Sequence, residues 1–461
     1  MATVLNADFR GEVITAEHDA YDEARLIHNR RFDCRPAFIV RPRDTSDVAV
    51  AVRAAREAGL PLSVRGGGLH MAGFATNDGG IVIDLSSMRD VQVDSRARTA
   101  SFGGGATTGD LQSAASRHGL GAITGVFAPT GVVGATLHGG IGALSNRHGW
   151  ACDSVLEGEL VTADGQILQV SDADHPDLMW ALRGAGGAFG VVTRLVTRLY
   201  PLPTEYIAAR LMYEPDALSE VLPVLDQTSR EAGDGVTMSV LVMRRPESGD
   251  FAGRVMAGVN LSFLGGRDEA DRVFGAFRTA APPALTSEMT SLDFRDMHFA
   301  IDDYPLSRPM RTFWDEDFSA GLTADLGRQI AAHSERIADF GTAEHGLVEL
   351  YPHREALVRN SAVSASFAQR TPGWTLSVCA GWDDPSRDAF FDDWVTGCVA
   401  DLRTATAGMG RAYLNAVSVA DLHRMERAYG ADVCCRLAQL KHRYDPANVF
   451  RRALPVVATG D

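Results

Sequence analysis

Residues 65–70 read Arg65-Gly66-Gly67-Gly68-Leu69-His70 and follow an apolar run that contains Leu60, Leu62 and Val64. Three consecutive glycines let backbone N–H groups approach an anion and let the chain adopt positive φ angles. The arginine adds positive charge, and the imidazole can contact or bond a cofactor ring. This combination suits a buried pyrophosphate and a flavin, with leucine standing before the histidine.

Length and charge limit the classes of function. The chain has 461 residues, of which 45% are hydrophobic and 22% charged, and its formal net charge is -15. That length allows a large core and about two domains. A chain with this net negative charge is unsuited to general binding of nucleic acids or anionic membranes. In addition, no apolar run is long enough to span a bilayer. We expect a protein that acts on small molecules, as a monomer or a homodimer.

Targeting and metal signals are absent from the sequence. Residues 1–11 contain Asp8 and Arg10 and no apolar segment typical of a secretory signal, so we expect a cytoplasmic protein. The six cysteines have no C-x-x-C spacing, and the histidines lack the spacing of metal ligands. We therefore expect neither a disulfide framework nor a metal site.

The first 202 residues alternate short apolar runs with glycine clusters. Thr45 and Ser46 can cap a helix that ends before Gly59, and Asp164-Gly165 predicts a hairpin turn. After Pro201 the glycine clusters stop and longer helical stretches alternate with strands. We expect an α+β fold rather than repeated βαβ units. We place a first domain at 1–202, a second that covers it at 203–410, and a C-terminal segment at 411–461 that returns to the first domain.

Four glycine clusters are candidates for holding phosphates. They are residues 66–68, 103–105, 131–142 and 184–190. Any single cluster can be a tight turn, but the four together favour an extended buried ligand. A dinucleotide site of the G-x-G-x-x-G type is not indicated, because no such motif stands between a strand and a helix.

Several motifs together carry a family resemblance. They are Arg65–Gly68, residues 73–85 (GFATNDGGIVIDL), the 131–142 run, residues 180–193, and Tyr444-Asp445-Pro446-x-Asn448-x-Phe450. The chain resembles the berberine-bridge-enzyme branch of the vanillyl-alcohol-oxidase flavoproteins over nearly its whole length. The resemblance implies a two-part FAD-binding domain and a substrate domain with an antiparallel sheet covered by helices.

Carried over residue by residue, the resemblance also implies a set of FAD contacts. These contacts are Arg65, Gly66, Gly67, Gly68, Leu69, His70, Gly73, Thr130, Gly131, Gly134, Ala135, Gly139, Gly140, Gly142, Gly190, Val192, Asn415 and Asn448.

Two positions depart from the family pattern. Relatives bond a histidine to the flavin at the position of Leu69, and His70 stands one place later. A shift of one residue in an extended segment turns a side chain to the opposite face. Relatives also form a second bond through a cysteine, where this chain has Phe127. We expect noncovalent FAD, with attachment through His70 as the alternative.

Three residues are candidates for catalysis: Glu349, His138 and Tyr413. Glu349 aligns with the strand from which relatives present a carboxylate, and burial beside the ring would raise its pKa and suit it to act as a base. The alternative is a carboxylate that pairs with Arg354 or faces water. His138 stands before paired glycines near the ring, and the alternative is a hydrogen bond to nearby backbone. Tyr413 belongs to the family's Y-x-N element, which ends at Asn415.

Six further side chains are secondary candidates. Tyr351 and His353 follow Glu349 on the same expected strand, and His298 with the segment Asp302–Tyr304 could rim the pocket, with an ordinary acidic surface loop as the alternative.

The sequence thus predicts an FAD-dependent oxidoreductase. Such enzymes transfer hydride from a C–H bond of a medium-sized organic or natural-product substrate to flavin N5, with dioxygen as the electron acceptor. Loss of the tether at Leu69 motivates an alternative, a cyclase or isomerase that uses FAD as a scaffold without net redox chemistry. A flavin-binding protein without catalysis fits less well, because the second domain is large.

Overall fold

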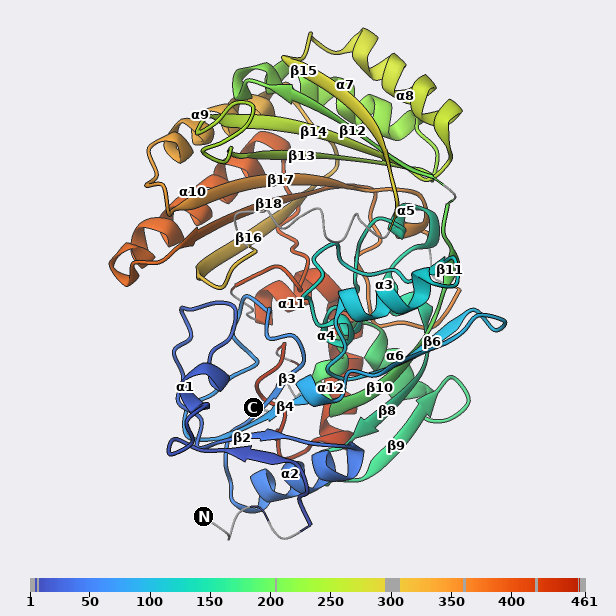
Figure 1. Cartoon of the computed structure of the whole chain (residues 1–461), viewed down its shortest axis with the longest axis vertical. Helices are drawn as coiled ribbons and strands as arrows, with labels where there is room; N and C mark the ends of the chain where they lie inside the picture. The colour runs from blue at the N-terminus through green and yellow to red at the C-terminus, as the bar shows by residue number, and fades with distance from the viewer. Residues whose placement is uncertain are drawn as a thin grey trace.

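The structure is a computed structural model that describes residues 5, 8–203, 205–294, 307–359, 362–418, 422–454 and 456. Figure 1 shows a lower half with small sheets, built from the start and the end of the chain, and an upper half with one large sheet. His298 and Asp302–Tyr304 lie outside the described residues. No helix in the described part of the chain is long and apolar enough to cross a bilayer.

The first sheet of the lower half has four strands, in the order β1 (Glu12–Ile14), β2 (Phe38–Arg41), β4 (Ile81–Asp84) and β3 (Leu62–Arg65). Both β2 and β3 run parallel to β4, so helix α2 (Thr45–Glu57) makes a single crossover; the short helix α1 is Tyr21–Ala24. The side chain of Asp44 accepts hydrogen bonds from the backbone N–H groups of Ser46 and Asp47. Asp44 is therefore the cap, and our prediction of Thr45 or Ser46 is wrong.

The second sheet is antiparallel, in the order β5 (Val91–Asp94), β6 (Thr99–Gly103), β10 (Val191–Arg198), β8 (Val155–Val161) and β9 (Ile167–Ser171). Strands β8 and β9 form the predicted hairpin, and Gly165 takes the positive φ that its turn requires. The remaining elements of this half are α3 (Thr108–Ser116), β7 (Leu120–Gly121), α4 (Val132–Leu137), α5 (Ser145–His148), α6 (Pro176–Ala185) and β11 (Tyr200–Pro201).

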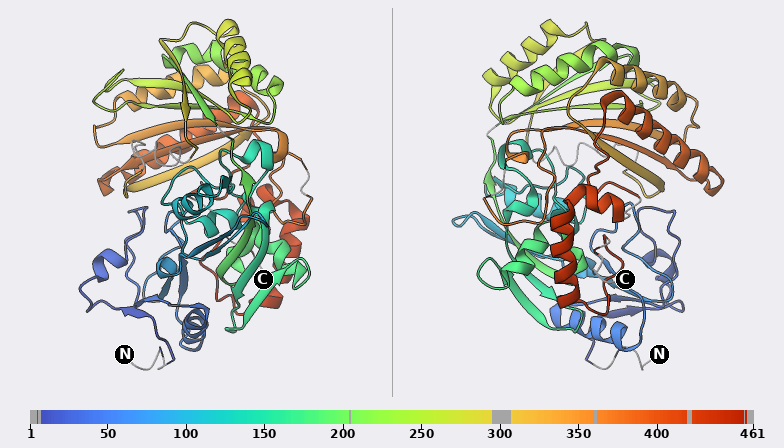
Figure 2. Two further views of the ribbon diagram at one scale, coloured as in Figure 1. Left: turned by 45° about the vertical axis from the view of Figure 1, so that its right-hand side comes forward. Right: turned by 180° about the vertical axis from the view of Figure 1, so that it is seen from behind.

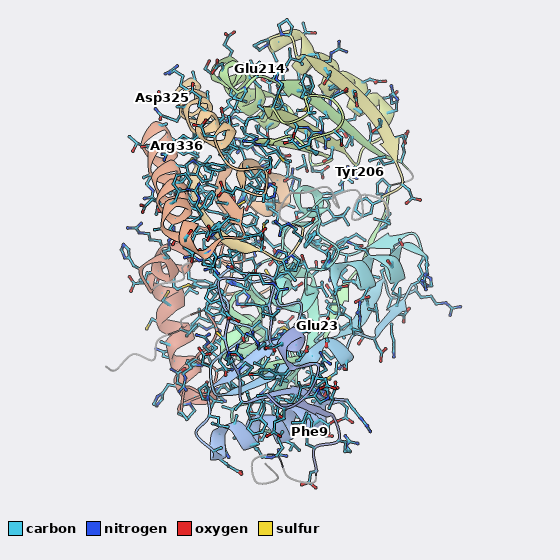
Figure 3. All side chains as sticks on the ribbon, turned by 60° about the vertical axis from the view of Figure 1, so that its left-hand side comes forward. Phe9, Glu23, Tyr206, Glu214, Asp325 and Arg336 are labelled. Carbon is cyan, nitrogen blue, oxygen red and sulfur yellow. The ribbon has the colours of Figure 1, made fainter. Side chains whose placement is uncertain are left out.

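The upper half contains one antiparallel sheet of seven strands. Their order is β15 (Thr286–Leu292), β12 (Tyr206–Tyr213), β14 (Val255–Phe263), β13 (Val236–Arg244), β17 (His345–His353), β18 (Gly373–Trp382) and β16 (Arg311–Ser319). All seven lie between residues 206 and 382. In Figure 3, Tyr206 at the start of β12 lies beside the lower half. Glu214, which follows the last residue of β12, lies at the far side of the upper half.

Four helices cover the outer face of this sheet (Figures 1 and 2). They are α7 (Leu218–Glu231), α8 (Arg267–Ala280), α9 (Ala324–Ala338) and α10 (Asp388–Thr406). Side chains alternate along each strand, so Val240 and Val242 of β13 pack into the core beneath these helices while Leu241 and Met243 face the lower half. The fold is the α+β arrangement that the sequence predicted.

The C-terminal segment packs on the lower half, as the right view of Figure 2 shows. It contains α11 (Leu422–Tyr429) and α12 (Ala431–Tyr444), and Tyr429 and Leu437 share a hydrophobic core with Leu178 and Leu182 of α6. The two ends of the chain therefore form one structural unit.

Lys441 fixes the path of the chain after α12. Its buried ammonium donates to Asp445 Oδ2 at 2.7 Å, to the carbonyl of Ala188 at 2.7 Å and to that of Phe450 at 3.1 Å. Burial lowers the pKa of Lys441, and the charge of Asp445 opposes that shift. The hydrogen bond to Ala188 thus joins the C-terminal segment to the residues that precede β10, and Asp445 supplies the counter-charge for the ammonium that makes it.

Asp445→Asn should therefore destabilise the protein, because it leaves a buried ammonium without a counter-charge. We expect a loss of about 3 kcal/mol in the free energy of unfolding, measured by denaturant titration. Asp432→Asn, in the exposed first turn of α12, is the control. Equal stability of the two variants would show that the pair does not hold the tail.

Candidate functional site

A cavity of about 1020 Å³ lies between the two halves. The glycine loops of the lower half form one wall, and the inner face of the seven-stranded sheet forms the opposite wall. Most of the predicted site residues line this cavity: Gly66, Gly67, Gly68, Leu69, His70, Thr130, Gly131, Gly134, Ala135, His138, Gly140, Gly142, Gly190, Val192, Glu349, Tyr413 and Asn415. The structure does not bring Arg65, Gly73, Gly139 or Asn448 to the cavity wall.

Two of the glycine loops touch through their backbones. A Cβ on Gly67 would clash with the backbone of Gly131, and a Cβ on Gly131 would clash with Gly67 in return. Gly68 follows with a φ of 69°, in the left-handed region. The two loops can meet at this point because neither carries a side chain there.

The same loops present unused hydrogen-bond donors. The backbone N–H groups of Gly67, Gly68 and Leu69 donate to no acceptor among the described residues, and neither do those of Val133 and Gly134 at the start of α4. All five residues line the cavity. Converging N–H groups of this kind bind anions, so the loops fit the pyrophosphate of a dinucleotide.

Arg65 has a structural position instead. Its guanidinium donates to the carbonyl oxygens of Ala24, Arg25 and Ala75 and is buried. It therefore holds the chain segments around the first glycine loop, and its charge is directed away from the cavity wall.

The other residues outside the wall also have local roles. Gly73 lies against the ring of Phe32, and Gly139 lies against the ring of Phe367. Asn448 turns the chain after α12 with a φ of 50°.

The 103–105 cluster serves close packing. The N–H groups of Gly103, Gly104 and Gly105 donate to the carbonyls of Asp90, Thr193 and Met88. Only Gly104 of the three lines the cavity. These amides are already paired, so the cluster offers no anion cradle.

Both ring nitrogens of His70 are engaged within the protein. Nδ1 accepts from the N–H of Ala72 at 3.1 Å, and Nε2 lies 3.0 Å from the carbonyl oxygen of Leu414. Burial lowers the pKa of His70 to about 4, and a nearby His138 adds to the shift. The ring is therefore neutral, with its proton on Nε2. Leu69 and Phe127 also line the cavity.

His138, Tyr413 and Asn415 form one cluster beside α4. The Tyr413 hydroxyl accepts from the N–H of Gly140 at 2.9 Å and from Asn415 Nδ2 at 2.7 Å. Burial raises the pKa of Tyr413, so its phenol stays protonated. His138 Nδ1 lies 3.0 Å from the carbonyl of Gly134, and burial lowers its pKa. A neutral ring that donates from Nδ1 leaves Nε2 as an acceptor.

Glu349 stands on the central strand β17, opposite Leu241 of β13 and Ser377 of β18. Its carboxylate makes no hydrogen bond or ion pair with the described residues, and burial raises its pKa to about 7. The alternative pairing with Arg354 is wrong, because Arg354 pairs with Asp226 at 2.9 Å.

Glu316 was missed by the sequence reasoning. It lies on β16 and is also opposite Ser377, so it shares a row across the sheet with Glu349. Its Oε2 accepts from the N–H of Tyr413 at 3.0 Å, whereas its buried Oε1 has no partner. Burial raises the pKa of Glu316 to about 8. The sequence signal that could have identified Glu316 is the alternation of side chains along the strand at 314–318. This alternation places Glu316 and Trp314 on the same face of the sheet, which lines the cavity.

The secondary candidates on β17 differ in their positions. Tyr351 lines the cavity, and burial raises its pKa well above the ordinary value. His353 is buried with Nε2 2.9 Å from the Thr375 hydroxyl, and burial lowers its pKa to about 3. His353 is therefore neutral and packed within the protein.

Comparison with known proteins agrees with this arrangement. The FAD binding domain family matches residues 36–171, and the berberine and berberine like family matches residues 412–456. The two matches correspond to the glycine-loop half and to the C-terminal segment that packs on it. They define a flavoprotein of the FAD-linked oxidoreductase class.

Similarity to individual proteins extends over the whole chain. The sequence is 32% identical to (R)-6-hydroxynicotine oxidase of Paenarthrobacter nicotinovorans, covering 98% of this chain and 97% of that protein. The crystal structure of 6-hydroxy-D-nicotine oxidase from Arthrobacter nicotinovorans superposes with a TM-score of 0.89 at 30% identity over 99% of both chains. The chain therefore belongs to the berberine-bridge-enzyme-like FAD-linked oxidoreductases, and FAD is its cofactor.

A more distant neighbour shares the fold. It is the glucooligosaccharide oxidase of Acremonium strictum, with a TM-score of 0.84 at 19% identity over 98% of each chain. That enzyme carries 6-S-cysteinyl, 8α-N1-histidyl FAD. None of these comparisons supports the redox-neutral cyclase alternative.

Gly67→Ala tests the glycine cradle. The added methyl would force the two loops apart and displace the free N–H groups, so we expect the purified protein to lose most of its FAD. The measurement is the ratio of flavin to protein absorbance. Gly275→Ala, in the interior of α8 with open space around it, is the control and should keep its FAD. Full FAD content in Gly67→Ala would contradict the assignment.

Proposed function

We propose that this protein is an FAD-dependent oxidase that acts on a medium-sized organic substrate, with natural-product intermediates included in that class. When bound, FAD supplies the hydride acceptor at N5 and passes the electrons to dioxygen. The observation that carries the proposal is the unpaired carboxylate of Glu349, which faces the cavity that the glycine loops also line. Similarity to 6-hydroxynicotine oxidase supports the oxidase chemistry.

Glu349 is the residue best suited to remove a proton from a substrate hydroxyl or amine. A general base works best with a pKa near the operating pH, and burial brings the pKa of Glu349 to about 7. Because its carboxylate forms no hydrogen bond or ion pair with the residues that the structure describes, both oxygens are available to a substrate. Glu349 can thus accept the proton while the hydride leaves the adjacent carbon.

Glu316 and Tyr413 line the same cavity as this base. With a pKa of about 8, Glu316 is mostly protonated at neutral pH and adds little negative charge beside Glu349. Tyr413 donates its backbone N–H to Glu316 and accepts two hydrogen bonds at its hydroxyl, so it links the sheet to the loop at Gly140. His138 Nε2 adds an acceptor on the lower wall.

We further propose that FAD is held without a covalent bond. The support is the neutral His70, whose two nitrogens are used by Ala72 and Leu414, together with the apolar side chains at Leu69 and Phe127. The remaining contacts from Thr130, Gly190, Val192 and Asn415 would then hold the cofactor by packing and hydrogen bonds.

Glu349→Gln should lower kcat by roughly a hundredfold or more, because it removes the proton acceptor while preserving size. In the parent enzyme kcat/KM should rise with pH through about 7 as the carboxyl ionises, and the variant should lose this ascending limb. The assay is peroxide release with a substrate found by screening amines and alcohols. Glu344→Gln, at a carboxylate paired with Arg387, is the control. A variant that keeps both rate and pH dependence would refute the role.

Acid precipitation tests the mode of attachment. We expect the flavin to stay in the supernatant, and His70→Ala should release the same fraction as the parent. Absorbance of the supernatant and of the redissolved pellet measures this fraction. Flavin that remains on the parent polypeptide but leaves the variant would show a bond through His70.

A further inference from the structure

Two arginines face the cavity from the part of the sheet distant from Glu349. Arg210 lies on β12, and Arg245 follows the last residue of β13. Both side chains line the cavity. They are close enough that the charge of Arg245 lowers the pKa of Arg210, after the larger effect of burial.

Neither guanidinium has a carboxylate partner among the described residues. Arg210 Nε donates to Asn260 Oδ1 at 2.9 Å, and Arg245 Nε is buried without a hydrogen bond. Glu288 lies opposite Arg210 in the strand register and its charge favours the protonated guanidinium, but the two do not form an ion pair. Two like charges thus face one cavity with no ion pair to either, and the carboxylate of Glu288, which also lines the cavity, offsets them only from a distance.

Two neighbouring arginines have partners within the protein, although Arg244 Nε is buried without one. Arg244 donates to the carbonyls of Ile337, Ala338 and Phe340 at the end of α9. Arg254 pairs with Glu214. Arg210 and Arg245 differ from these two arginines, because neither guanidinium has a carboxylate or a backbone carbonyl as partner among the described residues.

The strand register fixes how far the backbone of Arg210 lies from that of the base, while Arg245 lies four residues beyond Leu241 along the chain. From Glu349 the row of partners runs through Leu241 of β13 and Gly258 of β14 to Met212 of β12, two residues from Arg210. Three strand spacings of roughly 4.8 Å correspond to about 14 Å across the sheet. A ligand that reaches both sites would be a medium-sized molecule.

We propose that Arg210 and Arg245 bind a carboxylate on the substrate, at the end opposite the carbon that reacts. Guanidinium groups bind carboxylates through charge-assisted and often bidentate hydrogen bonds. The unused donors of both arginines supply such bonds, and the anion neutralises the two adjacent charges. This inference rests on the proposed function, because it assigns the reacting end of the same molecule to Glu349.

The test compares two ligands on the FAD-loaded full-length protein. Phenylbutanoate and its neutral analogue phenylbutanamide are titrated by calorimetry and by the change in flavin absorbance. We expect the carboxylate to bind at least about tenfold tighter, since one charge-assisted bond of this kind is worth a factor of that order. Arg210→Gln and Arg245→Gln should each remove most of this preference and leave amide binding unchanged.

Arg254→Gln is the matched control, because it removes an arginine of the same sheet outside the cavity. Flavin content and thermal unfolding confirm that every variant is folded and loaded. Equal binding of acid and amide, a preference that survives in the Arg210→Gln/Arg245→Gln double variant, or no binding of the carboxylate would overturn the proposal. A protein that cannot be loaded with FAD would instead overturn the proposed function.

Discussion

The backbone contact between Gly67 and Gly131 is the constraint on which the site depends. Two loops from separate parts of the first 202 residues approach without side chains between them, and the residues whose N–H groups have no acceptor among the described residues line one cavity. A methyl group at either position would separate the loops by more than packing can absorb. Close approach of the backbones and a set of free donors therefore arise from the same residues, and together they make an anion cradle.

The opposite wall follows from the alternation of side chains in the seven-stranded sheet. One face must be apolar to pack under α7–α10, and this leaves the other face free for polar chemistry. Glu316 and Glu349 share one row of that face, while Arg210 lies three strands from Glu349. A rigid sheet thus holds carboxyl groups and guanidinium groups at fixed separations over one cavity, which is a firmer support than loops would provide.

The sequence predicted the parts of the molecule that depend on local chemistry. The glycine loops, the hairpin at Gly165 and the position of Glu349 on a strand all follow from short patterns. The pairing of Glu316 with Glu349 could not be predicted, because it depends on the register between β16, β18 and β17 rather than on any motif. The position of Arg65 could not be predicted either, since two of the three carbonyls that bind it, those of Ala24 and Arg25, belong to a segment about forty residues away.

The change at Leu69 illustrates how one residue alters the demands on the rest of the site. A covalent bond holds a cofactor whatever the quality of its other contacts, whereas a noncovalent cofactor depends on all of them. In this chain the imidazole of His70 is committed to Ala72 and Leu414, so it ties the first glycine loop to the C-terminal segment. The histidine thus connects the glycine loop to the C-terminal segment, and with the noncovalent attachment that we propose, retention of FAD depends on the geometry of the loops.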